Sequence, residues 1–297
     1  YFTNYTTTGS TVIYNGTFFM PIALHASIPT MVYIGSSRVF SYDAAVGGSA
    51  TQLGNLALGN WAIKTCPSNA SRIYAAGGAT SFAAAGQLFM TSNGGSTWDT
   101  ISDQPGFPAV FPRISDIGVH PNNSAFVYAT FSGYTDGVKV VYSSSGGQDW
   151  YNISYDLPNL PVWSIEVDAS NNIYIGTDLG VYYKAAGATS WEPFYNGLPN
   201  VPVSDLAINA GSDQLLASTF GRGIWKSSLR TACPLSVTIN SNVSGYYFRS
   251  ASSSITMSGK VTGGLGSDVV LRSNGYIDLT PGFQANADPG STFTGII

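Results

Sequence analysis

The sequence predicts an all-β protein, and three observations carry this prediction. Charged residues make up only 9% of the chain, where roughly 25% is ordinary, and 34 of the 297 residues are glycine. This composition favours many short strands and turns over long helices. Apolar strand-like phrases recur along the chain, and several end in a Gly-Gly turn followed by Trp. The steps between Trp98, Trp150 and Trp191 are 52 and 41 residues. That is the length of one four-stranded blade, so the predicted fold is a β-propeller.

About four and a half repeat units are visible. Each combines apolar strand phrases with a turn rich in Gly, Asn or Pro, and they span residues 31–48, 60–98, 117–150, 162–191 and 203–226. Such propellers usually have six to eight blades. We therefore expect earlier blades upstream of Tyr1, with a closed five-blade ring as the alternative.

The closing turns have a local physical logic. The Gly94-Gly95 and Gly146-Gly147 pairs supply the positive φ angles of a tight turn. A short polar side chain just before the pair, such as Asn93, accepts hydrogen bonds from the loop. The Trp that follows is predicted to pack between neighbouring sheets, at Trp98, Trp150 and Trp191 alike.

Residues 91–98 and 143–150 resemble Asp-boxes, also called BNR repeats, which occur in sialidases, sortilin-type receptors and xyloglucan-hydrolysing propellers. The loop acid position holds Asn93, Ser145 and Ala186, so these copies are degenerate. The resemblance covers about residues 20–230, and we assign 1–230 to propeller blades. The segment 219–225 resembles the closing blade of secreted propellers of Bacteroidota.

From about residue 231 the pattern changes. Residues 250–259 echo residues 273–282, a step of 23, with short alternating strands around Ile255, Met257, Ile277 and Leu279. This predicts a small β-solenoid over 231–297. The segment resembles the three-rung coat-hanger module of surface proteins exported by the type IX system. The export signal proper is not present in these 297 residues.

Composition and charge restrict the partners. The net charge is −4, the isoelectric point is about 4.9 and the basic residues are scattered, which argues against nucleic acid. No run of 18 apolar residues predicts a membrane span. The chain opens at Tyr1 without a leader, so we expect any signal to lie upstream or to have been removed. Cys66 and Cys233 permit one disulfide, and the sequence leaves their pairing open.

Catalytic candidates are few. A propeller glycosidase needs two carboxylates across a groove. Asp178, in Thr177-Asp178-Leu179-Gly180, resembles a strand-end acid of such enzymes, but the same phrase is also an ordinary hairpin. Asp116 and Asp205 occupy equivalent strand positions in two units, and their repetition favours a structural role. A sialidase would need an arginine triad that this chain does not suggest. We expect no cofactor and no metal, because His25 and His120 stand alone.

Three functional hypotheses follow. The preferred one is a non-enzymatic cell-surface adhesion protein whose propeller loops hold a polysaccharide or protein, with the solenoid as a stalk. The alternatives are a secreted polysaccharide hydrolase whose acids lie partly upstream, and a structural component of an extracellular assembly. All three place the protein outside the cytoplasm. Asp99-Thr100-Ile101 resembles the O-glycosylation acceptor of Bacteroidota, so Thr100 is a candidate modification site.

Overall fold

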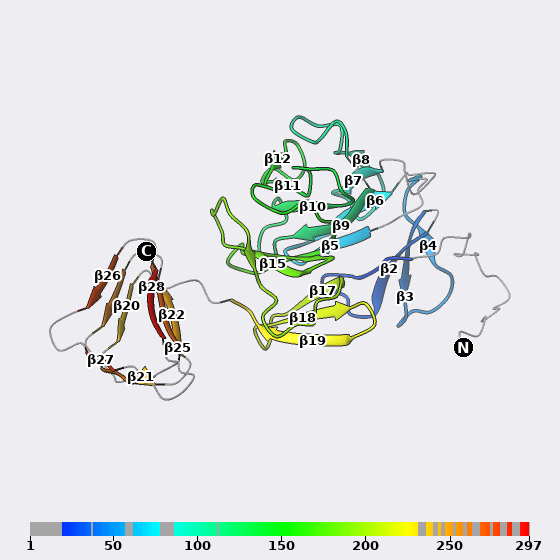
Figure 1. Cartoon of the computed structure of the whole chain (residues 1–297). Helices are drawn as coiled ribbons and strands as arrows, with labels where there is room; N and C mark the ends of the chain where they lie inside the picture. The colour runs from blue at the N-terminus through cyan, green and yellow to red at the C-terminus, as the bar shows by residue number, and fades with distance from the viewer. Residues whose placement is uncertain are drawn as a thin grey trace. The chain divides into compact units, whose positions relative to one another are not determined.

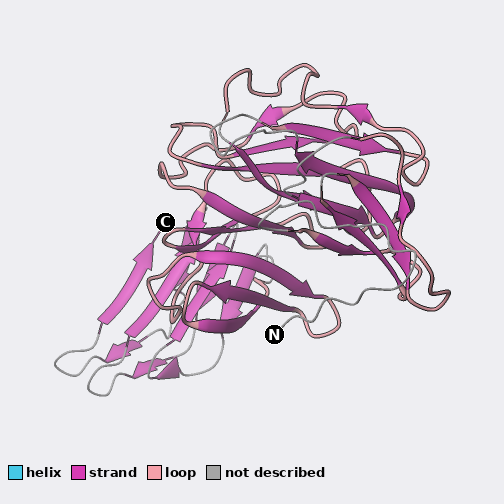
Figure 2. Ribbon diagram, turned by 90° about the vertical axis from the view of Figure 1, so that its right-hand side faces the viewer, coloured by secondary structure: helices cyan, strands magenta, loops and turns pink. Residues whose placement is uncertain are grey.

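The computed structural model describes residues 20–36, 38–56, 62–77, 86–111 and 113–230, together with the strands between residues 236 and 296. The chain divides into two compact units, Tyr1–Leu229 and Arg230–Ile297. All regular structure described is β-strand, which confirms the predicted all-β class (Figure 2). No described helix is long and apolar enough to cross a bilayer.

The first unit is a five-bladed β-propeller (Figure 1). Each blade is an antiparallel sheet whose strands follow the order of the chain. Blades 1 and 2 comprise β1 (Ile22–Leu24), β2 (Met31–Gly35), β3 (Val39–Asp43), β4 (Thr51–Gln52), β5 (Ala62–Cys66), β6 (Asn69–Gly77), β7 (Gln87–Thr91) and β8 (Asp99–Thr100). Blades 3 and 4 comprise β9 (Arg113–Val119), β10 (Val127–Ser132), β11 (Val140–Ser143), β12 (Tyr151–Asn152), β13 (Val162–Val167), β14 (Ile173–Thr177), β15 (Gly180–Lys184) and β16 (Glu192–Pro193).

Blade 5 differs from the others because three strands are described for it in place of four. They are β17 (Val203–Asn209), β18 (Gln214–Thr219) and β19 (Gly223–Ser228).

In every blade the first strand is innermost, and the first strands of consecutive blades from 1 to 5 pack against one another. Their register shifts at the same place in blades 3, 4 and 5, next to Ser115, Trp163 and Ser204. Such bulges redirect side chains near a rim.

The core lies between the blades. Tyr74, Tyr128 and Tyr174 occupy equivalent positions in second strands and are fully buried. Two of their hydroxyls reach the next blade, where Tyr74 donates to the Ser124 carbonyl (3.0 Å) and Tyr128 to Asn171 Oδ1 (2.6 Å). A blade therefore completes its burial only against a neighbour, as repeat architectures require.

The predicted turn chemistry is present. Gly94 and Gly95 have φ angles of +68° and +93°, and Gly146 and Gly147 have +75° and +98°. Asn93 Oδ1 accepts the Thr97 amide (3.0 Å). The strand residue that precedes the turn also takes part, since Thr91 Oγ1 accepts the Gly95 amide (2.9 Å).

The burial prediction for the tryptophans needs one correction. Trp150 and Trp191 are buried, with 3% and 6% of their surface exposed, but Trp98 is only half-buried. Phe107 covers Trp150 edge-on, with ring centroids 5.2 Å apart. The corresponding segment beside Trp98 begins with the small, polar pair Gly54-Asn55, which offers less cover.

The second unit consists of three parallel sheets of three strands each. The strands are β20 (Ser236–Ile239), β21 (Val243–Ser244), β22 (Tyr247–Ala251), β23 (Ser254–Met257), β24 (Lys260–Thr262), β25 (Asp268–Ser273), β26 (Tyr276–Leu279), β27 (Gln284–Asn286) and β28 (Thr292–Ile296). Every third strand pairs, so β20, β23 and β26 form one sheet. Ile255 lies opposite Ile277 and Met257 opposite Leu279. The register there is 22 residues, one fewer than the sequence echo suggested.

Candidate binding surface at the loop end of the channel

The innermost strands bring four charged side chains together at the centre of the ring. Lys64 of blade 2 donates to Glu166 Oε1 of blade 4 at 2.7 Å, an ion pair between blades that are not neighbours in the chain. Desolvation alone would lower the pKa of Lys64, but its attraction to Glu166, Asp116 and Asp205 outweighs that effect, so the pKa is raised. The cluster therefore connects blades 2, 3, 4 and 5.

Asp116 and Asp205 hold equivalent positions in this cluster, as the sequence indicated. Asp116 accepts the amides of Ile117 (2.8 Å) and of Ile165 in the next blade (2.9 Å). Burial raises the pKa of Asp116 to about 6, although Lys64 and the two amides oppose that shift. Asp205 accepts the Leu206 amide (3.0 Å), and burial also raises its pKa. Because Asp116 joins blade 3 to blade 4, the hydrogen bonds support the structural role.

One end of the channel is formed by the starts of the first strands and by the hairpins between second and third strands. We call it the loop end. Pairing of Val162 with Thr177 and of Val203 with Thr219 places the β14–β15 and β18–β19 hairpins there. The β10–β11 loop joins them, since Arg113 pairs with Ser132.

Asp178 lies on the loop end in the β14–β15 hairpin, where both of its carboxylate oxygens are engaged. Trp163 Nε1 donates to Oδ1 (2.7 Å), and the Tyr134 hydroxyl of blade 3 donates to Oδ2 (2.9 Å). The hydrogen bond to Asp178 raises the pKa of Tyr134. Trp163 is the bulged residue of β13, so the bulge aims its indole at the hairpin. The carboxylate thus fixes two aromatic rings from two blades.

A second network holds the loop that carries Tyr134. The Lys139 ammonium donates to the Gly133 carbonyl (2.7 Å) and to Asn159 Oδ1 (2.6 Å), while Asn159 Nδ2 donates to the Tyr134 carbonyl (2.9 Å). Desolvation lowers the pKa of Lys139. These hydrogen bonds join the β10–β11 loop to the loop that contains Asn159. Its consequence is a loop that presents Tyr134 in one position.

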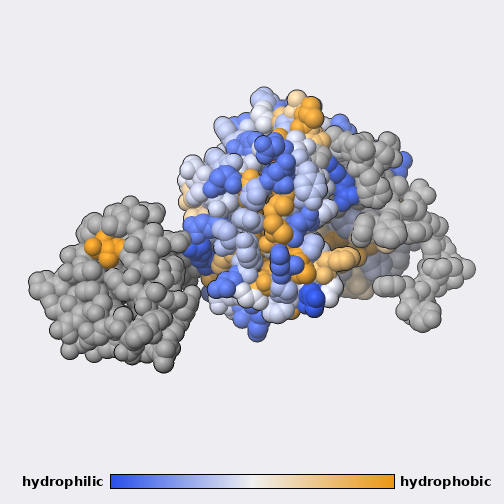
Figure 3. Space-filling view, viewed as in Figure 1, coloured by the Kyte–Doolittle hydropathy of each residue, from blue (hydrophilic) through white to orange (hydrophobic). Residues whose placement is uncertain are grey.

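The loop end exposes large apolar side chains. Tyr134 is 66% exposed, Phe220 in the β18–β19 hairpin is 77% exposed, and Leu179 beside Asp178 is 45% exposed. Exposed aromatic rings are typical of binding surfaces. Elsewhere, the side of the first unit seen in Figure 3 is mostly hydrophilic, with a narrow apolar strip between polar residues.

Several residues singled out in the sequence take other roles. Phe107 and Phe111 lie in the interblade core with Phe131. His120 Nδ1 accepts the Asn122 amide (3.1 Å), which is the turn-capping role of Asp168 in the next blade. Trp163 and Phe220 were not predicted as site residues, although an aromatic residue next to the start of a strand was a signal for Trp163.

The structure describes the surroundings of Thr100 and of Cys66. Thr100 lies in β8 opposite Phe89 and is half-buried, with Asp99 exposed beside it. Cys66 is a free, buried thiol, and burial raises its pKa to about 12. Cys233 lies outside the described residues. Among those residues, no three His, Cys, Asp or Glu side chains are grouped as a metal site would require.

Comparison with known proteins was informative only at the level of fold. No protein-family model and no curated protein sequence matches the chain. An ancestral GH74 enzyme matches with a TM-score of 0.56 and 18% identity over 69% of this chain and 30% of its own. The GH74 xyloglucanase from Xanthomonas campestris matches with a TM-score of 0.55 and 17% identity, over 69% of this chain and 35% of its own.

A protein from a different class is nearly as similar. The Cps50 (Swd1) β-propeller domain of Myceliophteria thermophila has a TM-score of 0.51 and 13% identity, over 69% of this chain and 64% of that domain. By contrast, the chain spans only about a third of the length of the two GH74 structures. At these identities the similarity establishes one property of the chain, which is the β-propeller fold.

Proposed function

We propose that the propeller binds a neutral polysaccharide at its loop end and acts as a surface-binding protein outside the cytoplasm. The observation that carries the proposal is the Tyr134–Asp178–Trp163 arrangement, in which one carboxylate fixes two aromatic rings at the channel end. Fixed aromatic faces pack on the apolar faces of sugars without a large loss of side-chain entropy. The low content of charged residues favours a neutral ligand.

A glycan array followed by calorimetry tests this proposal, with neutral β-glucan oligosaccharides included. We expect Tyr134→Ala to weaken binding by about tenfold, which corresponds to about 1.4 kcal/mol. Tyr151→Ala is the matched control, because Tyr151 is a similarly exposed tyrosine (54%) on the outer strand β12. Equal losses in both variants, or no binding on the array, would contradict the proposal.

The second candidate is a propeller glycosidase, supported by the similarity of fold to GH74 enzymes. Asp178 is its acid candidate on this chain. Catalysis needs a second carboxylate about 5 to 9.5 Å away. Release of reducing sugar from xyloglucan by the chain, lost in Asp178→Asn, would support the hydrolase. Glycan binding without hydrolysis supports the binding protein.

The second unit contributes to localisation in this proposal. Its parallel pairing of every third strand supports a three-rung β-solenoid of the coat-hanger type. We infer that it serves as a stalk in a protein exported by the type IX machinery. Fractionation of the source cells tests this, and recovery of the parent protein mainly from the cytosol would contradict it.

A further inference from the structure

The same hydrogen bond joins neighbouring blades at three of their contacts, which we call seams. Trp98 Nε1 donates to the Leu53 carbonyl (3.3 Å), Trp150 Nε1 to the Ile101 carbonyl (2.9 Å) and Trp191 Nε1 to the Ile153 carbonyl (2.9 Å). In each case the acceptor is the residue that directly follows the outer strand of the preceding blade. Each indole therefore connects its own blade to the blade before it.

Phe194 of blade 4 is the fourth residue of this kind. The amides of Ile101 and Ile153 donate to the carbonyls of Leu88 (2.9 Å) and Val140 (3.0 Å) in the adjacent third strands. The Phe194 amide donates in the same way to the Val181 carbonyl (2.7 Å). By this correspondence the carbonyl of Phe194 is the place where a Trp from blade 5 would donate.

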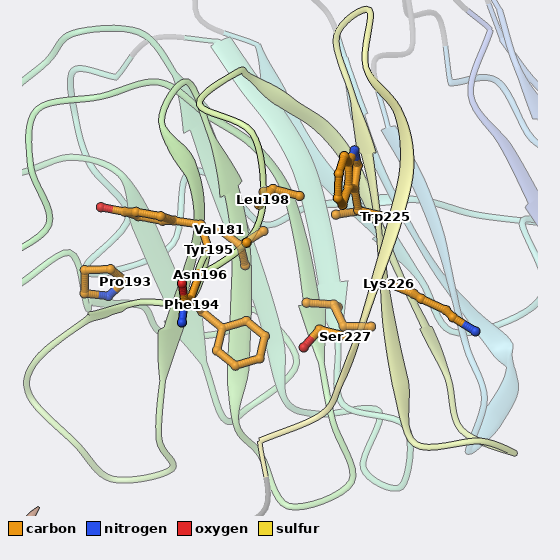
Figure 4. A pocket seen from close by; sticks show the side chains of 12 residues that line it. Val181, Pro193, Phe194, Tyr195, Asn196, Leu198, Trp225, Lys226 and Ser227 are labelled. Carbon is orange, nitrogen blue, oxygen red and sulfur yellow. The ribbon is translucent and has the colours of Figure 1, made fainter. Parts of the chain in front are cut away.

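Blade 5 supplies no such Trp. It ends at β19, and the six residues that follow in the sequence, 229–234, contain neither a Gly-Gly turn nor Trp. In its place the structure has a pocket of about 430 Å³ between blades 4 and 5 (Figure 4). Figure 4 shows Val181, Phe194 and Leu198 on one side of the pocket and Trp225 on the other, with Lys226 pointing away.

The walls of this pocket correspond to the walls around Trp150. Val127 and Ala129 pair with Ser143 and Val141 in blade 3, as Leu215 and Ala217 pair with Ser227 and Trp225 in blade 5. The core around Trp150 contains Leu88, Ile101, Phe107, Val127, Ala129 and Val141. The lining of the pocket contains Val181, Phe194, Leu198, Leu215, Ala217 and Trp225.

Two equivalent glycines, one beside Trp150 and one beside the pocket, differ in what lies next to them. Gly106 and Gly197 have φ angles of +83° and +82° and stand one residue before Phe107 and Leu198, whose amides close equivalent turns. A Cβ atom on Gly106 would lie 1.9 Å from the Trp150 carbonyl oxygen. On Gly197 it would meet nothing within 4 Å. The backbone has the same conformation at both glycines. Gly106 lies against the backbone of Trp150, whereas no described residue takes that place beside Gly197.

Within the part of the chain that the structure describes, β19 pairs only with β18 and forms the edge of blade 5. All six residues of β19 are exposed, including Ile224 (74%) and Trp225 (41%). An exposed apolar edge strand is a template for another strand. Arg222 and Lys226 flank Trp225, and residues 214–230 contain no acid, so this edge favours an acidic segment.

We propose that an extended segment from outside this chain adds to β19 as the fourth strand of blade 5 and places a Trp in the pocket. In blades 2 and 4 the residue after the Trp is acidic, and Asp99 and Glu192 lie opposite Met90 and Tyr183. The equivalent position in blade 5 is Lys226, so the partner motif is Trp followed by Asp or Glu.

The chain's own tryptophans do not meet this need. Trp98, Trp150 and Trp191 fill the other seams, and Trp163 donates to Asp178. Trp225 belongs to β19 itself, and Trp61 adjoins β5 in the sequence. Residues 1–19 contain no Trp. The indole therefore comes from outside these 297 residues.

Fluorescence anisotropy with a labelled peptide tests the proposal on the full chain. The peptide copies residues 94–103, Gly-Gly-Ser-Thr-Trp-Asp-Thr-Ile-Ser-Asp. We expect saturable binding that falls at least tenfold when the peptide Trp is replaced by Ala. Replacing the peptide Asp that follows Trp by Lys should also weaken binding, and Lys226→Glu in the protein should restore binding of that second peptide.

A variant that fills the pocket supplies the control. Ala217→Trp should abolish binding, whereas Ala207→Trp, an exposed position on β17 away from the pocket, should leave it unchanged. Absence of binding, or binding unaffected by the loss of the peptide Trp, overturns the proposal. Binding that appears only after removal of residues 1–19 also overturns it, because it would assign the pocket to the chain's own segment.

Discussion

The indole of Trp150 donates to the carbonyl of Ile101, which belongs to the preceding blade. Gly147, three residues before Trp150, lies against the same Ile101, because a Cβ atom at Gly147 would stand 2.6 Å from Ile101 Cδ1. The Gly-Gly turn and Trp150 thus both contact Ile101. The Gly-Gly-x-x-Trp phrase is a device for joining blades, and this explains why its spacing recurs while the loop acid does not.

Truncation of Trp150 should therefore be costly. We expect Trp150→Ala to lower the free energy of unfolding by about 3 kcal/mol, through the cavity and the lost hydrogen bond. Trp98→Ala should cost about half as much, because Trp98 is only half-buried. Urea denaturation followed by circular dichroism measures both, and a larger loss at Trp98 would contradict the burial argument.

Gly147 should tolerate no side chain. Gly147→Ala combines a positive φ of +98° with the contact to Ile101, and we expect a loss of about 3 kcal/mol. Gly48→Ala is the matched control, because Gly48 has φ of +92° but no atom within 4 Å of a Cβ. It should cost about 1 kcal/mol from the backbone alone. Equal losses would show that Ile101 yields to the methyl group.

The Lys64–Glu166 pair should stabilise the ring through its geometry. Lys64→Met removes the only base of the central cluster and leaves Glu166, Asp116 and Asp205 together. The pair is partly exposed, with side-chain exposures of 28% and 19%, so we expect a loss of about 2 kcal/mol, between the values for surface and buried pairs. Adding Glu166→Leu should recover part of that loss, and a double-mutant cycle in urea measures it.

Asp116 should make stability fall as the pH rises. Its folded pKa of about 6 exceeds the unfolded value of 3.8, so the folded state holds more protons between these values. The stabilisation is fully present below pH 4 and is lost by about pH 6.5, which amounts to about 3 kcal/mol from this group. Urea midpoints between pH 4 and 7 should show that slope, and Asp116→Asn should reduce it. An unchanged slope would assign the effect to other groups.

Thr100 remains a candidate site of O-glycosylation. It lies in a two-residue outer strand next to the exposed Asp99, where the edge of blade 2 is accessible. Peptide mapping of protein from the native host should find a hexose-bearing peptide across Thr100, which Thr100→Val would remove. An unmodified peptide with sugar on Asn122 or Asn152 would contradict both the site and the suggested phylum.

The repeat made much of the fold predictable. The Gly-Gly turns, the Trp spacing and the alternation of apolar residues gave the blade order, because these are local signals with fixed periods. Trp98 was assigned too much burial, since its cover depends on which residues the preceding blade places over it. The Tyr134–Asp178 contact joins two loops 44 residues apart, and no local pattern encodes it. The pocket beside Phe194 is lined by residues of both blade 4 and blade 5, and no local pattern encodes it.

The hydrogen bonds from Trp98, Trp150 and Trp191 span 45, 49 and 38 residues, and each points back along the chain. A blade that emerges from a ribosome or an export channel therefore meets a surface that has already formed. Docking one blade at a time would close a loop of 38 to 49 residues at each step, so the loop-closure entropy per step would not grow with the number of blades.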